Sequence, residues 1–236
     1  MRSSERHQLK ADQFAAATGE TIEWASEHRK ALTYGTGILV AVAAILIAGF
    51  YWQQSRQQKA SALFAEALQH YTAPVVPAAT PVPAGAIGYH SASDRAADAS
   101  RRFVEVANKY PHTDSGTMAN YFVGLTAADM GDNTKAEEYL KKVADGGSSD
   151  IAALAKSALA NLYHDTGRDQ QAIDLYKQLI DKPTNTVPKA QSQLALADLY
   201  ATKDPSQART IYIEVAKDHA ENSIGQIANQ HMASLK

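Results

Sequence analysis

The longest apolar stretch of the chain runs from Leu32 to Trp52 and contains 21 residues without a charged side chain. A helix of that length spans roughly 31 Å, which is close to the thickness of the hydrocarbon core of a bilayer. Tyr34 lies near one end and Tyr51 lies at the other, where aromatic rings prefer the headgroup layer. The pattern predicts a single transmembrane helix.

A buried core helix and a cleaved signal peptide are the alternatives for this stretch. A core helix of about five turns normally carries a polar stripe, which is missing here. A signal peptide begins with a short basic segment and ends at a small-residue cleavage site. In this chain a leader of 31 residues comes first, and Gly49-Phe50-Tyr51-Trp52 ends the stretch. We therefore favour an uncleaved span.

The distribution of basic residues bears on the orientation of the span. Within 20 residues of it the two sides tie, with Arg29 and Lys30 before it and Arg56 and Lys59 after it. Over the whole leader, residues 1–31, the N-terminal side leads by five basic residues to two. Because basic residues concentrate on the cytoplasmic side, this favours a cytoplasmic leader and an exported C-terminal domain.

Beyond the span the pattern is helical except in one segment. In residues 53–71 apolar positions recur at three-to-four spacing, so the membrane helix is expected to continue as an amphipathic one. Residues 72–90 hold four prolines among Ala and Gly, which predicts a mobile loop. A plain connector and a proline-rich ligand are both compatible with it. Helices are then expected at 94–110, 114–130, 134–144, 150–166, 168–181, 189–202, 206–219 and 223–235.

Residues 91–236 contain an internal repeat. Ala136, Ala172 and Ala208 stand 36 residues apart. The bulky apolar residues that follow them keep the same period: Leu140, Tyr176 and Tyr212, then Val143, Leu179 and Val215. Self-similarity at this period is typical of stacked helix pairs that bury their apolar faces against one another.

These units resemble the tetratricopeptide repeat, which places a small residue and an aromatic in its first helix, Gly at the turn, and Ala and a large apolar residue in its second. The fullest match is in the second unit: Leu159-Ala160, Tyr163, Gly167, Ala172, Tyr176 and Leu179. In the third unit Lys203-Asp204-Pro205 replaces the Gly. Residues 57–71 with Ala99, Phe103 and Val106 look like a preceding, half-matched unit. The alternative is an alanine-rich bundle with coincidental spacing.

The predicted fold class is all-α, with one N-terminal transmembrane helix followed by a tetratricopeptide-like α-solenoid of about three to four helix pairs. This layout resembles the single-pass tetratricopeptide proteins of the bacterial inner membrane, including the ancillary SecYEG translocon subunit family. Leu9-Lys10-Ala11-Asp12-Gln13-Phe14 is similar to a Leu-Lys-x-Asp-x-Phe element ahead of the anchor in such proteins. The resemblance implies a periplasmic repeat domain that docks or assists other envelope proteins.

Composition narrows the possible functions. The net charge is −2 and acidic and basic residues are interspersed, which gives no indication of nucleic-acid binding. Cysteine is absent, which excludes disulfides, thiolate metal sites and a cysteine nucleophile. The eight histidines are scattered, and no phosphate-binding loop, dinucleotide glycine motif or nucleophile elbow occurs. We therefore predict a non-enzymatic protein without a cofactor, a metal or a small-molecule substrate, whose partners are other proteins and a bilayer.

In tetratricopeptide-like repeats the first helix of each pair lines a concave groove. The candidate groove residues are Met118, Tyr121, Leu125, Asn161, His164, Asp165, Leu194 and Asp198. No Lys or Arg falls among them, which argues against a clamp for an acidic peptide tail. An amphipathic or extended peptide with apolar anchors and some basic character fits better. Ordinary solvated residues are the alternative.

Within the span, small residues recur at intervals of four, three and four: Gly37, Ala41, Ala44 and Ala48. Such spacing allows close helix–helix contact in lipid, although alanine is common throughout this chain. Two hypotheses for the function remain open, a membrane-tethered module that binds clients and a structural subunit of a fixed complex. A reversed topology would instead make the protein a cytoplasm-facing adaptor.

Overall fold

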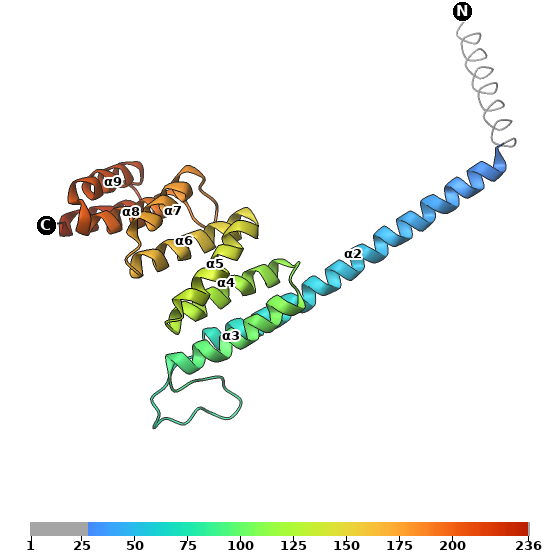
Figure 1. The fold of residues 1–236 in the computed structure, drawn as a ribbon, viewed down its shortest axis with the longest axis horizontal. Helices are drawn as coiled ribbons and strands as arrows, with labels where there is room; N and C mark the ends of the chain where they lie inside the picture. Colours follow the sequence, from blue (N-terminus) through green and yellow to red (C-terminus); the bar gives the residue numbers. More distant parts are fainter. Residues whose placement is uncertain (1–27, 236) are drawn as a thin grey trace, which may run out of the picture. The chain divides into compact units, whose positions relative to one another are not determined.

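The structure is a computed structural model that describes residues 28–235 (Figure 1). The regular structure in this range is α-helical, which confirms the predicted all-α class. The helices are α2 (Arg29–Tyr71), α3 (Ala92–Lys109), α4 (Asp114–Asp129), α5 (Asn133–Gly146), α6 (Ser149–Asp165), α7 (Asp169–Asp181), α8 (Lys189–Lys203), α9 (Pro205–Asp218) and α10 (Ser223–Ser234). The chain divides into two compact units, residues 1–55 and 56–236.

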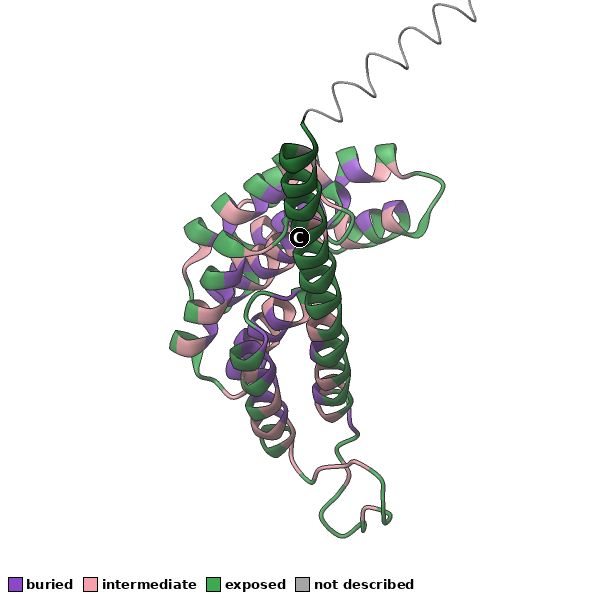
Figure 2. Ribbon diagram, turned by 90° about the vertical axis from the view of Figure 1, so that its right-hand side faces the viewer, coloured by how far each residue is buried: buried purple, intermediate pink, exposed green. Residues whose placement is uncertain are grey.

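The first unit contains the apolar part of α2. Its large apolar side chains are exposed to a degree unusual for a water-soluble surface, with Leu39 and Ile45 both 71% exposed. Figure 2 colours this part of the helix as exposed. Among the described residues, α2 alone is long and apolar enough to cross a membrane, and no part of its apolar window is buried.

The second unit begins with the last turns of α2, which pack antiparallel to α3. Phe64 and Tyr71 lie on one face of α2 because seven residues make about two helical turns. They pack against Phe103 of α3, and the Phe103 ring stacks on Phe122 of α4 with 4.8 Å between ring centres. Arg102 joins the two helices through an ion pair with Glu66 at 2.6 Å. This pair occupies the place of the preceding unit that the sequence indicated.

Three further helix pairs follow, α4 with α5, α6 with α7 and α8 with α9, and α10 packs on the last of them. The repeated alanines of the second helices, Ala136, Ala172 and Ala208, are each 0% exposed. On the first helices the matching small residues are equally enclosed. A Cβ atom added to Gly124 would lie 2.8 Å from Cγ of Leu140, so a larger residue could not keep this spacing.

The turns that join the two helices of each pair explain why the third unit lacks the turn glycine. Gly131 and Gly167 adopt positive φ angles of 77° and 74°, which L-residues with side chains rarely adopt. In the third pair Asp204 alone joins the helices, ending α8 and capping α9 through a bond from the Gln207 amide at 3.1 Å. Pro205 then starts α9 with a φ already suited to a helix. No glycine is needed because one residue links these two helices, whereas three residues link α4 to α5 and α6 to α7.

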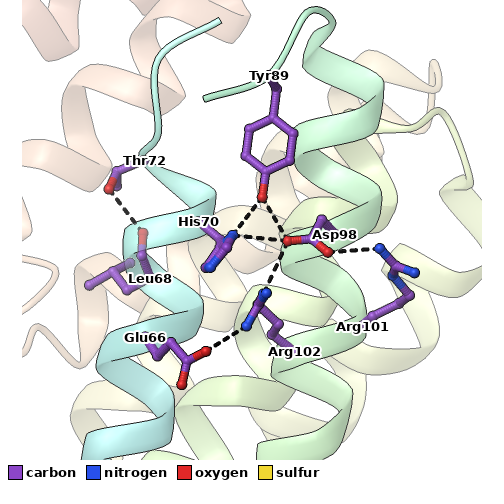
Figure 3. A network of polar contacts seen from close by, with 8 residues as sticks. All are labelled: Glu66, Leu68, His70, Thr72, Tyr89, Asp98, Arg101 and Arg102. Atoms are coloured by element: carbon purple, nitrogen blue, oxygen red, sulfur yellow. Dashed lines mark hydrogen bonds and ion pairs between the residues drawn. The ribbon is translucent and has the colours of Figure 1, made fainter. Parts of the chain in front are cut away.

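The proline-rich segment is a loop whose base is closed. The Val76 amide donates to the Tyr89 carbonyl at 2.8 Å, and the Tyr89 amide donates to the Pro74 carbonyl at 3.1 Å. The Tyr89 hydroxyl donates to Oδ2 of Asp98 on α3 at 2.6 Å, and Nδ1 of His70 lies 2.6 Å from that hydroxyl (Figure 3). The proline pattern predicts a loop but not this closure, which requires residues on α2 and α3.

Asp98 is the centre of this polar network. Arg101 and Arg102 donate to its carboxylate at 2.7 and 3.0 Å. Burial raises the pKa of Asp98, but the hydrogen bonds from Tyr89, Arg102 and Arg101 outweigh burial and lower it to about 2. The pKa of Tyr89 shifts in the opposite direction. Burial, the hydrogen bond to Asp98 and the Asp98 charge raise it to about 12.

Substituting Ala172→Leu should lower the free energy of unfolding by about 1–3 kcal/mol, because a larger side chain overpacks a close helix contact. Lys177→Leu, at an exposed position of the same helix, should change it by less than about 0.5 kcal/mol. Urea unfolding followed by circular dichroism compares the two variants. Equal stability of both would show that Ala172 does not sit at a close crossing.

The ion-paired Asp98 should make the loop anchor sensitive to acid. Because its folded pKa of about 2 lies below the ordinary 3.8, Asp98 stabilises the fold above about pH 4. This contribution, about 1–2 kcal/mol at neutral pH, is lost as the pH falls toward 2. Unfolding titrations of Asp98→Asn should therefore lack part of the acid-dependent loss seen in the parent chain. Glu105→Gln, at an exposed site on α3, serves as the control and should keep it.

Candidate protein-binding groove

A cavity of about 300 Å³ lies between α4, α6 and the beginning of α8. Its floor is apolar, and Leu140, Leu162 and Val187 on that floor are buried. Its rim is polar, with Asn161, Asp165 and Gln191 exposed. The first helices of successive pairs supply most of the lining, which follows from the 36-residue repeat placing equivalent faces side by side.

Four of the eight predicted groove residues line this cavity, namely Tyr121, Leu125, Asn161 and Asp165. Tyr121 and Leu125 come from α4 and are partly buried, whereas Asn161 and Asp165 come from α6 and are exposed. The lining from α4 is therefore mainly apolar, whereas α6 supplies both apolar and polar lining residues. An extended segment crossing from one pair to the next would meet both kinds of surface.

The other four predicted residues lie outside the cavity and have local partners. Met118 packs against the buried cluster of Val143, Ile151 and Ala155. Leu194 packs against the cluster around Tyr212 in the third pair. Nδ1 of His164 lies 2.6 Å from Oδ1 of Asp169, which also binds Lys203 of the next pair.

Asp198 is also occupied, and its contacts follow from the repeat. Its Oδ1 accepts a hydrogen bond from the Tyr212 hydroxyl at 2.5 Å and lies 2.7 Å from Nδ1 of His231 on α10. One repeat earlier, the Tyr176 hydroxyl donates to Oδ1 of Asn161. The tyrosines at the large apolar position of the second helix therefore each need an acceptor on the first helix. Asn161 and Asp198 supply it.

The first pair replaces this polar contact with an apolar one. Leu140 stands where the later pairs have tyrosine, and Leu125 stands where they have Asn161 or Asp198. Both leucines line the cavity. The groove is therefore apolar at the first pair because Leu125 and Leu140 together replace the polar residue and the tyrosine of the later pairs.

Asp165 is the acidic group of the cavity. Among the described residues it has no hydrogen-bond or ion-pair partner, unlike Asp198. Its charge reaches the neighbouring phenol, because burial and then the charges of Asp165 and Asp198 raise the pKa of Tyr176 to about 12. No Lys or Arg lines the cavity. The rim therefore favours a positively charged group on a ligand.

Leu154, Ala158 and Val187 also line the cavity and were not predicted. Leu154 stands 36 residues after Met118, so the repeat period alone could have identified it. Val187 lies between α7 and α8, where a repeat pattern based on helices gives no signal. It is buried because the segment before α8 folds back, with the Thr186 hydroxyl donating to the Asp150 carbonyl at 2.8 Å.

The predicted contact face of the apolar helix lies in the first unit. Gly37, Ala41, Ala44 and Ala48 are exposed on α2. Nothing in the described part of the chain lies within 4 Å of a Cβ built on Gly37. Their role in contact with another membrane helix stays a prediction.

Residues 28–235 also contain no group of three or more His, Cys, Asp or Glu side chains placed to hold a metal ion.

Asp198 and Asp165 should respond differently to truncation. Asp198→Ala leaves the Tyr212 hydroxyl without its acceptor and should lower the free energy of unfolding by about 1 kcal/mol or more. Asp165→Ala removes an unpaired surface carboxylate and should change it by less than about 0.5 kcal/mol. Thermal unfolding of both variants measures the difference. Equal losses would mean that the tyrosine contact does not contribute to stability.

Comparison with known proteins agrees with the fold. A family model described as a tetratricopeptide repeat-like domain matches residues 22–178, which is more than half of the chain. Neither the curated proteins nor the solved structures gave a match. The matched range includes the apolar part of α2 and the cavity-lining residues of α4 and α6. The chain therefore belongs to the tetratricopeptide repeat-like domain family.

Proposed function

We propose that this protein is a membrane-anchored interaction module of the bacterial cell envelope, which docks or assists other envelope proteins close to the protein translocon. Repeat domains of this kind are in general scaffolds that bind other proteins, and this chain belongs to that family. The observation that carries the proposal is the groove across α4 and α6, which combines an apolar floor with an acidic rim.

The apolar part of α2 supports the anchor. Residues 32–52 carry no charge, and none of the apolar window of α2 is buried within the described part of the chain. Insertion into lipid would cover this surface, whereas in water it would drive aggregation. A span confines the repeats to the membrane surface, which raises their effective concentration near membrane-bound partners.

The groove supports a peptide-like partner. Its volume suits one or two side chains of a segment rather than a whole small molecule held on all sides. An apolar side chain would enter between Leu125 and Leu154, and a basic one would pair with Asp165. Segments with this composition are exposed in chains that have not yet folded, which is why we favour client binding over a purely structural role.

The envelope location rests on charge and resemblance. Basic residues tie within 20 residues of the span, but the whole leader holds five against two in the 20 residues after the span, which by the positive-inside rule favours repeats on the exported side. The segment Leu9-Lys10-Ala11-Asp12-Gln13-Phe14, which lies outside the described residues, resembles the element found in the ancillary SecYEG subunit family. We accordingly place the protein in the inner membrane with a cytoplasmic N-terminus and a periplasmic C-terminal domain.

Site-specific photo-crosslinking in cells tests this function. A photoreactive amino acid at Ser157, on the groove, should yield adducts with several envelope proteins, whereas the same group at exposed Lys177 of α7 should yield few. Asp165→Lys should reduce the Ser157 adducts at least about tenfold, because it reverses the charge on the rim. Asp174→Lys, an exposed site outside the groove, is the matched control.

The pattern of adducts separates the alternatives. A single adduct of fixed stoichiometry, unaffected by Asp165→Lys, would instead identify a structural subunit of a fixed complex. Protease added to intact spheroplasts should degrade the repeats, because they face outward in our proposal. Repeats that survive until the membrane is opened would contradict the periplasmic orientation and indicate a cytoplasm-facing adaptor.

A further inference from the structure

The turn between α3 and α4 is fastened to the part of α2 that directly follows the apolar stretch. Nη2 of Arg56 donates to the Lys109 carbonyl at 3.2 Å, and the Arg56 guanidinium lies 5.8 Å from the centre of the Tyr110 ring. Nζ of Lys109 lies 5.9 Å from the same ring. Gln57 adds a contact to Asp114 at the start of α4. These contacts lie within the second unit. They place Arg56 at the end of this unit that holds the turn between α3 and α4.

The turn itself is held in one conformation. The Thr113 hydroxyl donates to the Tyr110 carbonyl at 2.8 Å and accepts from the Gly116 amide at 3.0 Å. Tyr110 and Thr113 are buried. A Cβ on Gly116 would lie 1.9 Å from the Tyr110 carbonyl oxygen, so the turn leaves no room for a side chain at position 116. The exposed residues of the turn, Pro111 and His112, directly follow Tyr110, whose ring lies near Arg56.

Chain length limits how far this turn can be from the end of the span. Arg56 follows Trp52 by four residues, and four residues reach at most about 14 Å even when fully extended. This limit holds for every angle between the two units of the chain. The headgroup layer on one side of a bilayer is itself roughly 5–8 Å thick. A span that ends at Trp52 thus brings Arg56 and the turn to the membrane surface.

We propose that the turn at residues 109–113, together with Arg56 and Lys59, forms a contact surface for anionic phospholipid headgroups. The inference rests on the proposed membrane anchor. Arg56, Lys59 and Lys109 are basic groups at this end of the α2–α3 pair, and Asp114, which accepts from Gln57, and Glu105 on α3 are acidic groups there. The contact would determine which end of the α2–α3 pair meets the bilayer, because the span holds this end near the lipid at every angle between the two units.

The other end of the pair provides an internal reference. Fifteen residues of helix separate Arg56 from Tyr71, which is about 22 Å of rise. The proline-rich loop follows Tyr71, and its exposed tip near Ala84 therefore lies at the opposite end of the α2–α3 pair from His112. Because the chain has no cysteine, a single cysteine can be placed at either position and labelled alone.

Fluorescence quenching on the full-length chain in liposomes tests the contact. His112→Cys and Ala84→Cys variants, each carrying a fluorophore, are reconstituted in phosphatidylcholine with and without phosphatidylglycerol, using lipids with a headgroup quencher. The His112 label should be quenched several-fold more than the Ala84 label, and more strongly when phosphatidylglycerol is present. Adding Lys59→Gln and Lys109→Gln to the His112→Cys variant should remove the phosphatidylglycerol effect.

Flotation of the same samples separates this inference from the anchor. Chains that float with the liposomes but show equal quenching at both positions would overturn the contact and leave the anchor intact. Equal quenching of the His112 label in both lipid mixtures would overturn the preference for anionic headgroups. Chains that do not float would overturn the anchor and this inference together.

Discussion

Close contact between the two helices of each pair is the constraint on which the repeat domain depends. Gly124, Ala160 and Ala197 on the first helices are buried, and so are the alanines that repeat on the second helices. Side chains this small let two backbones approach, and the larger residues then fill the space between successive pairs. The positions of the groove residues on the first helices follow from this packing, because these helices can face one direction only if each pair keeps the same spacing.

The tyrosines show how the same residues serve the core and the groove. Tyr176 and Tyr212 are 3% and 1% exposed, yet their hydroxyls reach polar acceptors on the first helix of the pair. A buried phenol needs such a partner, because an unsatisfied hydroxyl in the core is costly. Two of the predicted groove residues, Asn161 and Asp198, therefore contribute to stability. Asp165 has no such partner among the described residues, so its charge is available to the ligand that we propose.

The fold could be predicted from the sequence because it is periodic. The repeat spacing located the helix pairs and the small contact residues, and four of the eight predicted groove residues line the cavity. It missed what depends on partners outside the repeat, such as His231 beside Asp198 and Val187 between helices. It also included His164, whose ring is held by Asp169 at the turn rather than in the cavity. The closed base of the proline loop could not be predicted from the sequence. Prolines indicate where a helix ends, but not that Tyr89 at the end of the loop would bind the distant carboxylate of Asp98.

The closed base of that loop has a further consequence. Between Val76 and Tyr89 the backbone ends are joined, so the tip contributes nothing to the alignment of α2 with α3. Lengthening a segment whose ends are already fixed costs little, since the entropy of closing a loop grows only slowly with its length. The tip is therefore a natural insertion point, where extra sequence or an entire small domain could be carried on the array without disturbing its register.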